Sequence, residues 1–352
     1  MIPLLRAPAI AYRIFEVYGP ALFFILGFVF DIATLDRIDT LSTLIPVTFY
    51  LALSLGLIIR DTLKGEGPYT QDIIHFALGA LLSSYTLFFF KSASFLSSLA
   101  FLVFMVAILL FNETKWARSF QGALEVALLT LVVHCTFILF YPLVVGSVSM
   151  WIFWYAVLTG VALLSLVIFF LKKKLPIDQL KRTWIIPVGA MSIFLILLNI
   201  FKLIPPVPLA VQELGIYHNV EKDYPRYFLS LERPAWKFWQ SGDQHFRARP
   251  EDKVFVFARI FAPGGVEQQI IIHWQVYQDG WQTSDRIPLL IQGGREEGHR
   301  GYAYKQNYTP GLWRVSVETV DGREISRLDF EIEEDNSAQK RLLRTIVDGD
   351  EK

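Results

Sequence analysis

The amino-acid sequence predicts an α-helical membrane bundle of about seven transmembrane helices, followed by an all-β, immunoglobulin-like antiparallel sandwich. Two observations predict this organisation. Residues 1–206 of the 352 hold 24 charged side chains (14 Lys/Arg and 10 Asp/Glu) between long apolar runs, whereas residues 207–352 hold 42 (19 Lys/Arg and 23 Asp/Glu). The second half also alternates apolar and polar residues between turn dipeptides, as strands do. Only the second half therefore has the composition of a soluble domain, which is about 25% charged.

Seven apolar runs in the first half are long enough to cross a bilayer, because roughly 20 residues at 1.5 Å per residue span a hydrocarbon core of about 30 Å. They lie at about 14–33, 40–60, 71–90, 92–111, 122–145, 149–171 and 184–204. The first run contains Glu16 and the helix-kinking pair Gly19-Pro20. A signal peptide is the alternative for it, but the run has no clean small-x-small cleavage site and six more runs follow. We therefore count it as a span.

The distribution of basic residues predicts the orientation of the bundle. With the N-terminus in the cytoplasm, the outer loops carry 2 basic residues, Arg37 and Lys91, or 3 when Lys202 is counted. The inner segments carry 11, namely Arg6, Arg13, Arg60, Lys64, Lys115, Arg118, Lys172, Lys173, Lys174, Lys181 and Arg182. An odd number of spans then places the C-terminal domain outside, which is the periplasm in a Gram-negative bacterium.

Ionisable groups inside the predicted spans are few, and they are functional candidates because a charge in hydrocarbon is costly. Glu125 lies one turn into the fifth span and His134 lies near its middle. They are nine residues apart, about 180° around a helix, so they cannot form one site on that helix. One interpretation is a proton or ion path; the other is that each bonds a carbonyl or hydroxyl within the bundle. A haem requires two histidines at matching depth, which His75 and His134 do not provide, so no cofactor is expected.

The chain divides into a transmembrane domain (1–206), an aromatic-rich linker or flap (207–250), a β-sandwich (251–334) and a polar tail (335–352). The linker contains the run Trp236-Lys237-Phe238-Trp239. Two interpretations of this run are open. It rests on the outer face of the bilayer, or its rings pack against the β domain as an extra strand or flap. The tail fits either a short amphipathic helix over 339–347 or a frayed end.

Alternation and turn signals predict six or seven short strands in 251–334. Residues 254–261 are strand-like, and in 270–277 the side chains of Ile270, Ile272, Trp274 and Val276 share one face. Asp279-Gly280 and Asp321-Gly322 are hairpin turn signals. The last strand points Leu328, Phe330 and Ile332 inward, and a short strand is expected at 302–304. This spacing is typical of a sandwich.

Basic and aromatic side chains gather in the best candidate for a ligand site. They are Arg286, Arg295, His299, Arg300, Tyr302, Tyr304 and Lys305. Arginine forks bind oxyanions in bidentate fashion and aromatic rings stack on sugar faces, so an anionic saccharide, a lipid headgroup or a phosphate fits. In the alternative interpretation, the glycines of this stretch make turns, the tyrosines pack, and Glu296 and Glu297 neutralise the arginines.

The sequence contains no motif of a known catalytic site: G-x-S-x-G, H-E-x-x-H, the P-loop and Cys/His metal spacing do not occur. We therefore predict no catalytic residue and no metal site, and an enzyme is the less favoured class. Nucleic acid is not an expected partner, because the second half is net negative and predicted to lie outside. The single cysteine, Cys135, excludes a disulfide within the chain.

The run GLWRVSVETVDGREISRLDFEIEE, preceded by HWQVYQDGW and GGREEGHRGYAYK, resembles a C-terminal β domain of unknown function from bacterial, mainly proteobacterial, proteins. The multi-span half is similar to an uncharacterised inner-membrane family often joined to that domain, so the resemblance covers nearly the whole chain. It implies the architecture and a bacterial inner-membrane location, but no activity.

Three functions are compatible with these features. The first is a membrane protein whose extracytoplasmic β domain binds a cell-envelope glycan, a lipid headgroup or a protein partner. The alternative is a transporter or flippase-like bundle with an accessory β domain. The third, a membrane enzyme acting on a lipid-linked substrate, needs paired carboxylates or histidines at one membrane face, and none is convincing. The lipid bilayer is the one partner common to all three.

Overall fold

The computed structural model describes most of the chain beyond residue 39. The described residues are 40–65, 67, 69–92, 98–112, 122–237, 239–295, 298–337 and 339–349. The predicted first span at 14–33, with Glu16, lies outside them. So do Phe238, Glu296 and Glu297 from the linker and the candidate ligand site.

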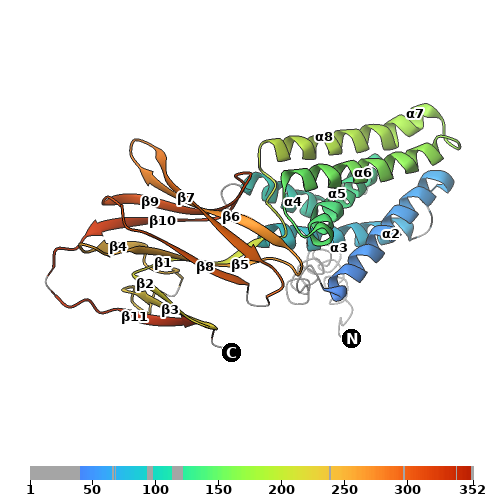
Figure 1. Ribbon diagram of the computed structural model, residues 1–352. Coiled ribbons are helices and arrows are strands. Elements are labelled where there is room, and N and C mark those ends of the chain that lie inside the picture. The colour runs from blue at the N-terminus through green and yellow to red at the C-terminus, as the bar shows by residue number, and fades with distance from the viewer. Residues whose placement is uncertain are drawn as a thin grey trace, which may run out of the picture. The chain divides into compact units, whose positions relative to one another are not determined.

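A series of helices occupies the first half of the chain (Figure 1). They are α2 (Leu41–Lys64), α3 (Thr70–Lys91), α4 (Leu99–Asn112), α5 (Ala123–Val145), α6 (Met150–Leu171), α7 (Ile177–Leu180), a π-helical turn (Lys181–Ile185) and α8 (Ile186–Ile200). The last three form one continuous helical segment, Ile177–Ile200. Pro187 lies inside this segment and has no N–H to donate to the preceding turn, which is the π-helical one.

Five helical segments in the described part of the chain are long and apolar enough to cross a membrane: α2, α3, α5, α6 and Ile177–Ile200. A sixth apolar helix, α4, has only 14 residues. The predicted number of seven spans is therefore not supported. The predicted fourth span, 92–111, differs because its helix begins at Leu99.

Helix α5 is the most enclosed of the spans. Its most apolar stretch is 67% buried, against 22% for α2. The Tyr85 hydroxyl of α3 lies 2.5 Å from the Thr136 hydroxyl of α5, so a buried polar contact joins these two helices. Helix α5 is therefore the centre of the described bundle.

The described residues of the second half form eleven strands (Figure 1). They are β1 (Ala210–Tyr217), β2 (Asn219–Asp223), β3 (Arg226–Leu231), β4 (His245–Ala248), β5 (Val254–Phe261), β6 (Glu267–Tyr277), β7 (Trp281–Gln292), β8 (His299–Lys305), β9 (Gly311–Thr319), β10 (Glu324–Glu334) and β11 (Arg344–Asp348). They form a five-stranded sheet β4-β10-β9-β6-β7 and two three-stranded sheets, β1-β5-β8 and β11-β3-β2. All pairs are antiparallel except β4 with β10.

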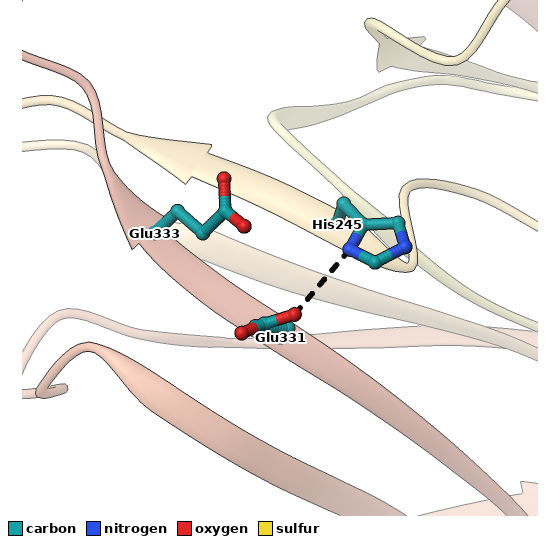
Figure 2. A group of neighbouring side chains, drawn as sticks. All are labelled: His245, Glu331 and Glu333. Carbon is teal, nitrogen blue, oxygen red and sulfur yellow. Dashed lines mark ion pairs between the residues drawn. The ribbon is translucent and has the colours of Figure 1, made fainter.

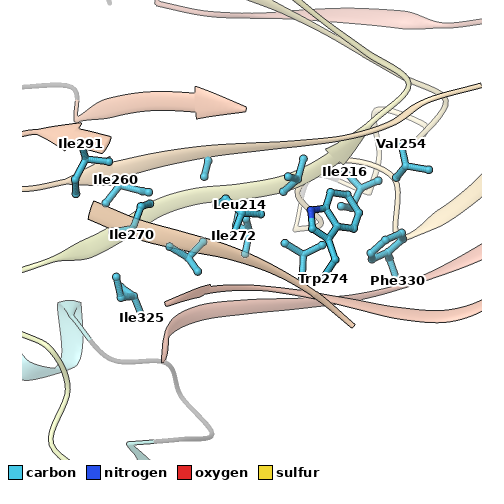
Figure 3. Close-up of a cluster of buried hydrophobic side chains, with 14 of the residues drawn as sticks. Leu214, Ile216, Val254, Ile260, Ile270, Ile272, Trp274, Ile291, Ile325 and Phe330 are labelled. Atoms are coloured by element: carbon cyan, nitrogen blue, oxygen red, sulfur yellow. The ribbon is translucent and has the colours of Figure 1, made fainter. Parts of the chain in front are cut away.

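The main core lies between the five-stranded sheet and the β1-β5-β8 sheet, which together form a two-sheet sandwich. Figure 3 shows Trp274 of β6 and Phe330 of β10 among aliphatic side chains such as Ile216 of β1 and Val254 of β5. The Trp274 and Phe330 rings meet edge to face, with centroids 6.2 Å apart. The inward faces predicted for 270–276 and 328–332 are confirmed by this core.

The small sheet β11-β3-β2 adds a third layer. Its Val220, Leu229 and Ile346 pack on Phe255 and Phe257, which point away from the main core. Strand β5 is thus covered on both faces, and this explains its nearly continuous apolar sequence, because a strand buried on both faces needs no polar alternation.

The segment 207–250, between the helices and the predicted sandwich, contains four strands, β1 to β4. The tail contains a fifth, β11, at the place where a helix or a frayed end was expected. Strand β11 pairs with β3, Ile346 opposite Leu229, and its half-buried Ile346 packs on the second cluster. The helix prediction for 339–347 is therefore wrong at this position, because a partner strand more than a hundred residues earlier supplies the backbone hydrogen bonds.

The chain forms two compact units. One contains most of the helical residues; the other contains all the strands together with Lys91–Leu99 and Leu139–Phe153. Within the second unit, the Glu267 amide donates to the Gly146 carbonyl at 3.0 Å and the Val148 amide to Gln268 Oε1 at 2.9 Å. Val148 is also part of the main core. The turn between α5 and α6 is therefore built into the strand-containing unit.

Candidate functional site

The predicted ligand site is divided between two faces by the alternation of strand β8. Tyr302 and Tyr304 stand opposite Phe257 and Phe255 of β5 and share their face, while Ala303 packs on the main core. Lys305 is two residues after Ala303 and therefore lies on the same face of β8; it is 9% exposed. The seven predicted residues therefore do not converge on one point.

Arg300 is engaged in an ion-pair network inside the domain. Its Nε lies 2.7 Å from Asp348 Oδ2, and its Nη1 donates to the Pro225 carbonyl at 3.0 Å. Arg259 reaches the other oxygen of the same carboxylate at 2.9 Å. Asp348 is 8% exposed. Two arginines thus fix the carboxylate of β11 to the β5–β8 pair.

Arg286 and Lys305 also have carboxylate partners. Arg286 Nη2 donates to Glu318 Oε2 at 3.1 Å. The Lys305 ammonium pairs with Asp285 and lies 5.4 Å above the Trp313 ring. Both cations are consequently neutralised by their own domain.

His299 and Arg295 lie where the β7–β8 connection ends. The Gln292 amide donates to His299 Nδ1 at 3.3 Å. Burial, with the nearby charges of Arg295 and Lys222, lowers the pKa of His299. Arg295 is exposed. The neutralising role considered for Glu296 and Glu297 lies outside the described residues.

The aromatic members of the predicted site form an exposed strip on the β5–β8 pair. Tyr302 is 40% exposed and Tyr304 is 48% exposed. Phe255 lies between them, with ring centroids 6.3 Å from Tyr302 and 5.5 Å from Tyr304. The Lys253 ammonium lies 4.7 Å from the centre of the Tyr304 ring. We call Lys253, Phe255, Tyr302 and Tyr304 the aromatic strip. A ring-shaped ligand can stack on it.

A second polar group lies on the outer face of the five-stranded sheet, and the sequence did not reveal it. His273 of β6, Glu318 of β9 and Thr283 of β7 come together there. His273 Nδ1 is 2.7 Å from Glu318 Oε1, and His273 Nε2 is 2.8 Å from the Thr283 hydroxyl. Since a carboxylate only accepts, Nδ1 carries a proton and donates it to Glu318. We call these three residues the His273 relay.

The Glu318 carboxylate of the relay accepts hydrogen bonds from three side chains, those of His273, Arg286 and Ser316. Burial raises the pKa of Glu318, but hydrogen bonds from Ser316 and His273 and the charge of Arg286 outweigh it, so that the pKa is lowered. The Ser316 hydroxyl donates to Glu318 Oε1 at 2.7 Å. The geometry orders the imidazole, as in hydroxyl–imidazole–carboxylate relays that activate a hydroxyl. The sequence could indicate only that His273 points away from the core, because it is adjacent to the inward-facing Trp274 in an alternating strand.

The two intramembrane candidates are both buried in α5. His134 is fully buried, with Nδ1 2.7 Å from the Thr130 carbonyl and Nε2 3.4 Å from the Ser192 hydroxyl of α8. Its ring also lies close to Gly160 of α6, where an added Cβ would come within 3.3 Å. Glu125 is 6% exposed. Both nitrogens of His134 are therefore within hydrogen-bonding distance of groups in the bundle.

Comparison with known proteins gives one family match. A family described as a protein of unknown function (DUF2914) matches residues 267–332, which run from β6 into β10. The expected resemblance to a C-terminal domain of unknown function is thereby confirmed for this region. The resemblance of the helical half to a membrane family stays a prediction. No curated protein matches the chain.

Similar solved structures cover only part of the chain. An immunoglobulin-like protein from Pseudomonas aeruginosa is 16% identical, with a TM-score of 0.20, over 33% of this chain and 97% of that one. A β-glucosidase from Listeria innocua in complex with glucose is 14% identical, with a TM-score of 0.21, over 32% of this chain and 16% of that one. A β-glucosidase from Kluyveromyces marxianus is 11% identical, with a TM-score of 0.18, over 38% and 15%. The chain thus spans about a sixth of the β-glucosidases that it matches.

Proposed function

We propose that this protein is a bacterial inner-membrane protein whose periplasmic β domain binds a cell-envelope component or a partner protein. The N-terminus is cytoplasmic, the predicted span at 14–33 is the first of seven crossings, and the sandwich is of immunoglobulin-like type. The helices act as an anchor for the domain. The aromatic strip is the ligand surface.

The proposed outer location of the β domain is supported by the helix-connecting segments that belong to the same compact unit as the strands. Charge asymmetry assigns Lys91, the α5–α6 turn and the chain after α8 to the outer side. These segments fall in the same compact unit as the strands, within Lys91–Leu99, Leu139–Phe153 and Lys202–Lys352. Charge and packing therefore group the same parts of the chain.

Helix α4 is the weakest element of the proposed topology. Its 14 residues measure about 21 Å at 1.5 Å per residue, which is less than the hydrocarbon core of about 30 Å. Its first residue belongs with the strand-containing unit and the rest with the helical unit. The proposal counts α4 as one of the seven crossings.

The aromatic strip is the observation that carries the binding proposal. Large aromatic side chains are usually covered in a folded domain, whereas Tyr302 and Tyr304 keep 40% and 48% of their surface exposed. They stand two residues apart on one strand, so their rings offer a continuous platform. Lys253 adds one positive charge beside it.

The charges around the strip favour a saccharide over a polyanion. Arg300, on the same face of β8 as the two tyrosines, is paired with Asp348, and so is Arg259 of β5. An anionic ligand would have to break such pairs, whereas sugar rings stack on tyrosines without doing so. We therefore favour a cell-envelope glycan as the ligand.

Thermal unfolding of the full-length protein in detergent micelles tests this function. The melting temperature of the β domain is followed against purified envelope glycans, lipid headgroups and polyanions, each at low and high salt. A saturable increase with a glycan is expected, because a ligand that binds only the folded state stabilises it. The increase should persist at high salt, since stacking is not screened.

Two variants decide whether the strip is the site. Tyr302→Ala/Tyr304→Ala should abolish the increase, whereas Tyr277→Ala, another exposed tyrosine (50%) at the end of β6, should preserve it. A shift that survives the double substitution would move the site elsewhere. A shift seen only with polyanions and lost at high salt would contradict the saccharide proposal.

A further inference from the structure

Three potential metal ligands meet on the outer face of the β4–β10 pair. Strands β4 and β10 run parallel, and their register sets His245 beside Glu331. Glu333 is two residues further along β10, so it projects from the same face. Figure 2 shows the three side chains rising from these two strands. His245 Nδ1 is 3.5 Å from Glu331 Oε2, and one ligand atom of each residue lies within 4.8 Å of the others.

The neighbouring cations are engaged with other carboxylates. Arg247 stands opposite Glu333 in the strand register, but its guanidinium bonds Glu232 at 2.8 Å. Arg314 is held in bidentate fashion by Asp329, at 2.6 and 2.8 Å. Within the described part of the chain, no ion pair reaches Glu333. Among the described residues, the two carboxylates therefore face one imidazole and no further ion-paired cation.

We propose that His245, Glu331 and Glu333 form a binding site for a divalent transition metal of the zinc type. One imidazole nitrogen and two carboxylate oxygens are ligands that Zn²⁺ accepts, at about 2.0–2.2 Å. Ca²⁺ and Mg²⁺ prefer oxygen ligands alone. Three protein ligands leave a fourth position for water or an oxygen atom of a partner.

The side chains can reach the required geometry by small rotations. Two ligands at about 2.1 Å in a tetrahedral site lie about 3.4 Å apart, and the separation of 3.5 Å between His245 and Glu331 already meets this. Glu333 is exposed, so its side-chain torsions are free to turn its carboxylate inward. The side chain of His245 is 63% exposed and that of Glu331 is 40% exposed, so a metal ion has direct access.

A metal ion bound there would join two chain segments that are far apart in sequence. Strand β4 is a short edge strand of four residues that pairs with β10. Coordination would fix β4 to β10 and present the open metal position to solvent. Sequence motifs could not indicate this site, because His245 and Glu331 are 86 residues apart and lack a local metal spacing.

Zinc titration of the full-length protein tests the proposal. The protein is purified in micelles without a histidine tag, stripped with a chelator, and titrated calorimetrically with ZnCl₂, CaCl₂ or MgCl₂. We expect one Zn²⁺ per chain at micromolar concentration, with weaker or no binding of Ca²⁺ and Mg²⁺. The melting temperature should rise only with Zn²⁺.

The variants locate the ion. His245→Ala and Glu333→Gln should each weaken Zn²⁺ binding by about tenfold or more, since even partners of metal ligands contribute that much. Glu334→Gln removes the same charge from an exposed neighbour on the opposite face of β10, and it should bind Zn²⁺ like the natural protein. All three residues are exposed, so the metal-free melting temperatures should agree. Unchanged zinc affinity in His245→Ala, or no Zn²⁺ binding at all, would overturn the proposal.

Discussion

His218, between β1 and β2, makes the stability of the β domain depend on pH. Its side chain is 3% exposed, and its ring stacks on Phe246 with centroids 4.1 Å apart. Burial and the charge of Arg341 lower its pKa from 6.5 to about 4. The charge of Asp252 opposes that effect in part. The folded domain therefore holds this imidazole neutral over a range in which the unfolded chain protonates it.

The sign and size of the effect follow from proton linkage. Between pH 6.5 and pH 4 the unfolded chain binds more protons at this residue, so the free energy of unfolding falls as the pH falls. A displacement from 6.5 to about 4 corresponds to about 3 kcal/mol in full, at 1.36 kcal/mol per unit. Between pH 7.5 and pH 5 the loss is about 2 kcal/mol.

Urea unfolding in micelles measures this loss. The surviving β domain is quantified by pulse proteolysis at pH 7.5 and at pH 5, in the natural protein and in His218→Phe. Phenylalanine keeps a ring on Phe246 but cannot take up a proton. We expect the natural protein to lose about 1 M more in its urea midpoint than the variant, given a slope of about 2 kcal/mol per M.

The exposed His245 provides the control. His245→Asn should follow the natural protein at both pH values when a chelator is present. If His218→Phe lost as much stability on acidification as the natural protein, burial of a neutral His218 would not be the cause, and the reasoning would fail.

Three further predictions concern other parts of the chain. Glu318→Gln should lower the stability of the β domain by about 2–3 kcal/mol, because it leaves buried hydrogen-bonding groups without their charged partner. The pKa of Glu318 is lowered from 4.5, so the natural network should lose stability as the pH falls below about that value, and the urea midpoint should fall less between pH 6 and pH 3.5 in Glu318→Gln than in the natural protein. Trp274→Ala should cost about 3–5 kcal/mol in urea unfolding, whereas Trp236→Ala, at a 63% exposed position, should change it by less than about 0.5 kcal/mol. Glu125→Gln should leave glycan binding and the β-domain melting temperature unchanged; lost function in cells with normal folding would favour the transporter interpretation instead.

Local signals predicted much of the fold. Asp279-Gly280 connects β6 to β7, and the alternation of Ile270, Ile272 and Trp274 placed these side chains in the main core. The short strand expected at 302–304 is part of β8. Such features are encoded within a few residues, since a turn dipeptide and a period of two need no distant partner.

Features that depend on distant partners were not predictable. No clear period marks 209–246, because Tyr217 and Leu229 are buried by a third layer that only the complete domain supplies. Strand β11 needs β3 as its partner. Side-chain contacts depend on distant partners in the same way. His273 lies between Ile272 and Trp274 in the sequence, and only the pairing of β6 with β7 and β9 brings Thr283 and Glu318 to it.

The candidate ligand site was predictable in composition but not in arrangement. The sequence placed its arginines and tyrosines within one stretch, as if they formed one surface. Strand alternation separated Tyr302 from Ala303, and Asp348 paired with Arg300 from the far end of the chain. Charge pairing across a sheet cannot be inferred from one strand alone. Only the fold therefore shows that Tyr302 and Tyr304 are the exposed members of the predicted site.

Labelling of single cysteines tests the central claim most directly, namely that the β domain lies outside the cytoplasm. Cys135 is the only native cysteine and is buried; it is replaced by alanine. Single cysteines are then introduced at Asn307, exposed in the β domain, and at Lys174, exposed after α6. In spheroplasts, a membrane-impermeant maleimide should label Asn307→Cys at once and Lys174→Cys only after lysis. Labelling of Lys174→Cys in intact spheroplasts, with Asn307→Cys protected, would contradict the account.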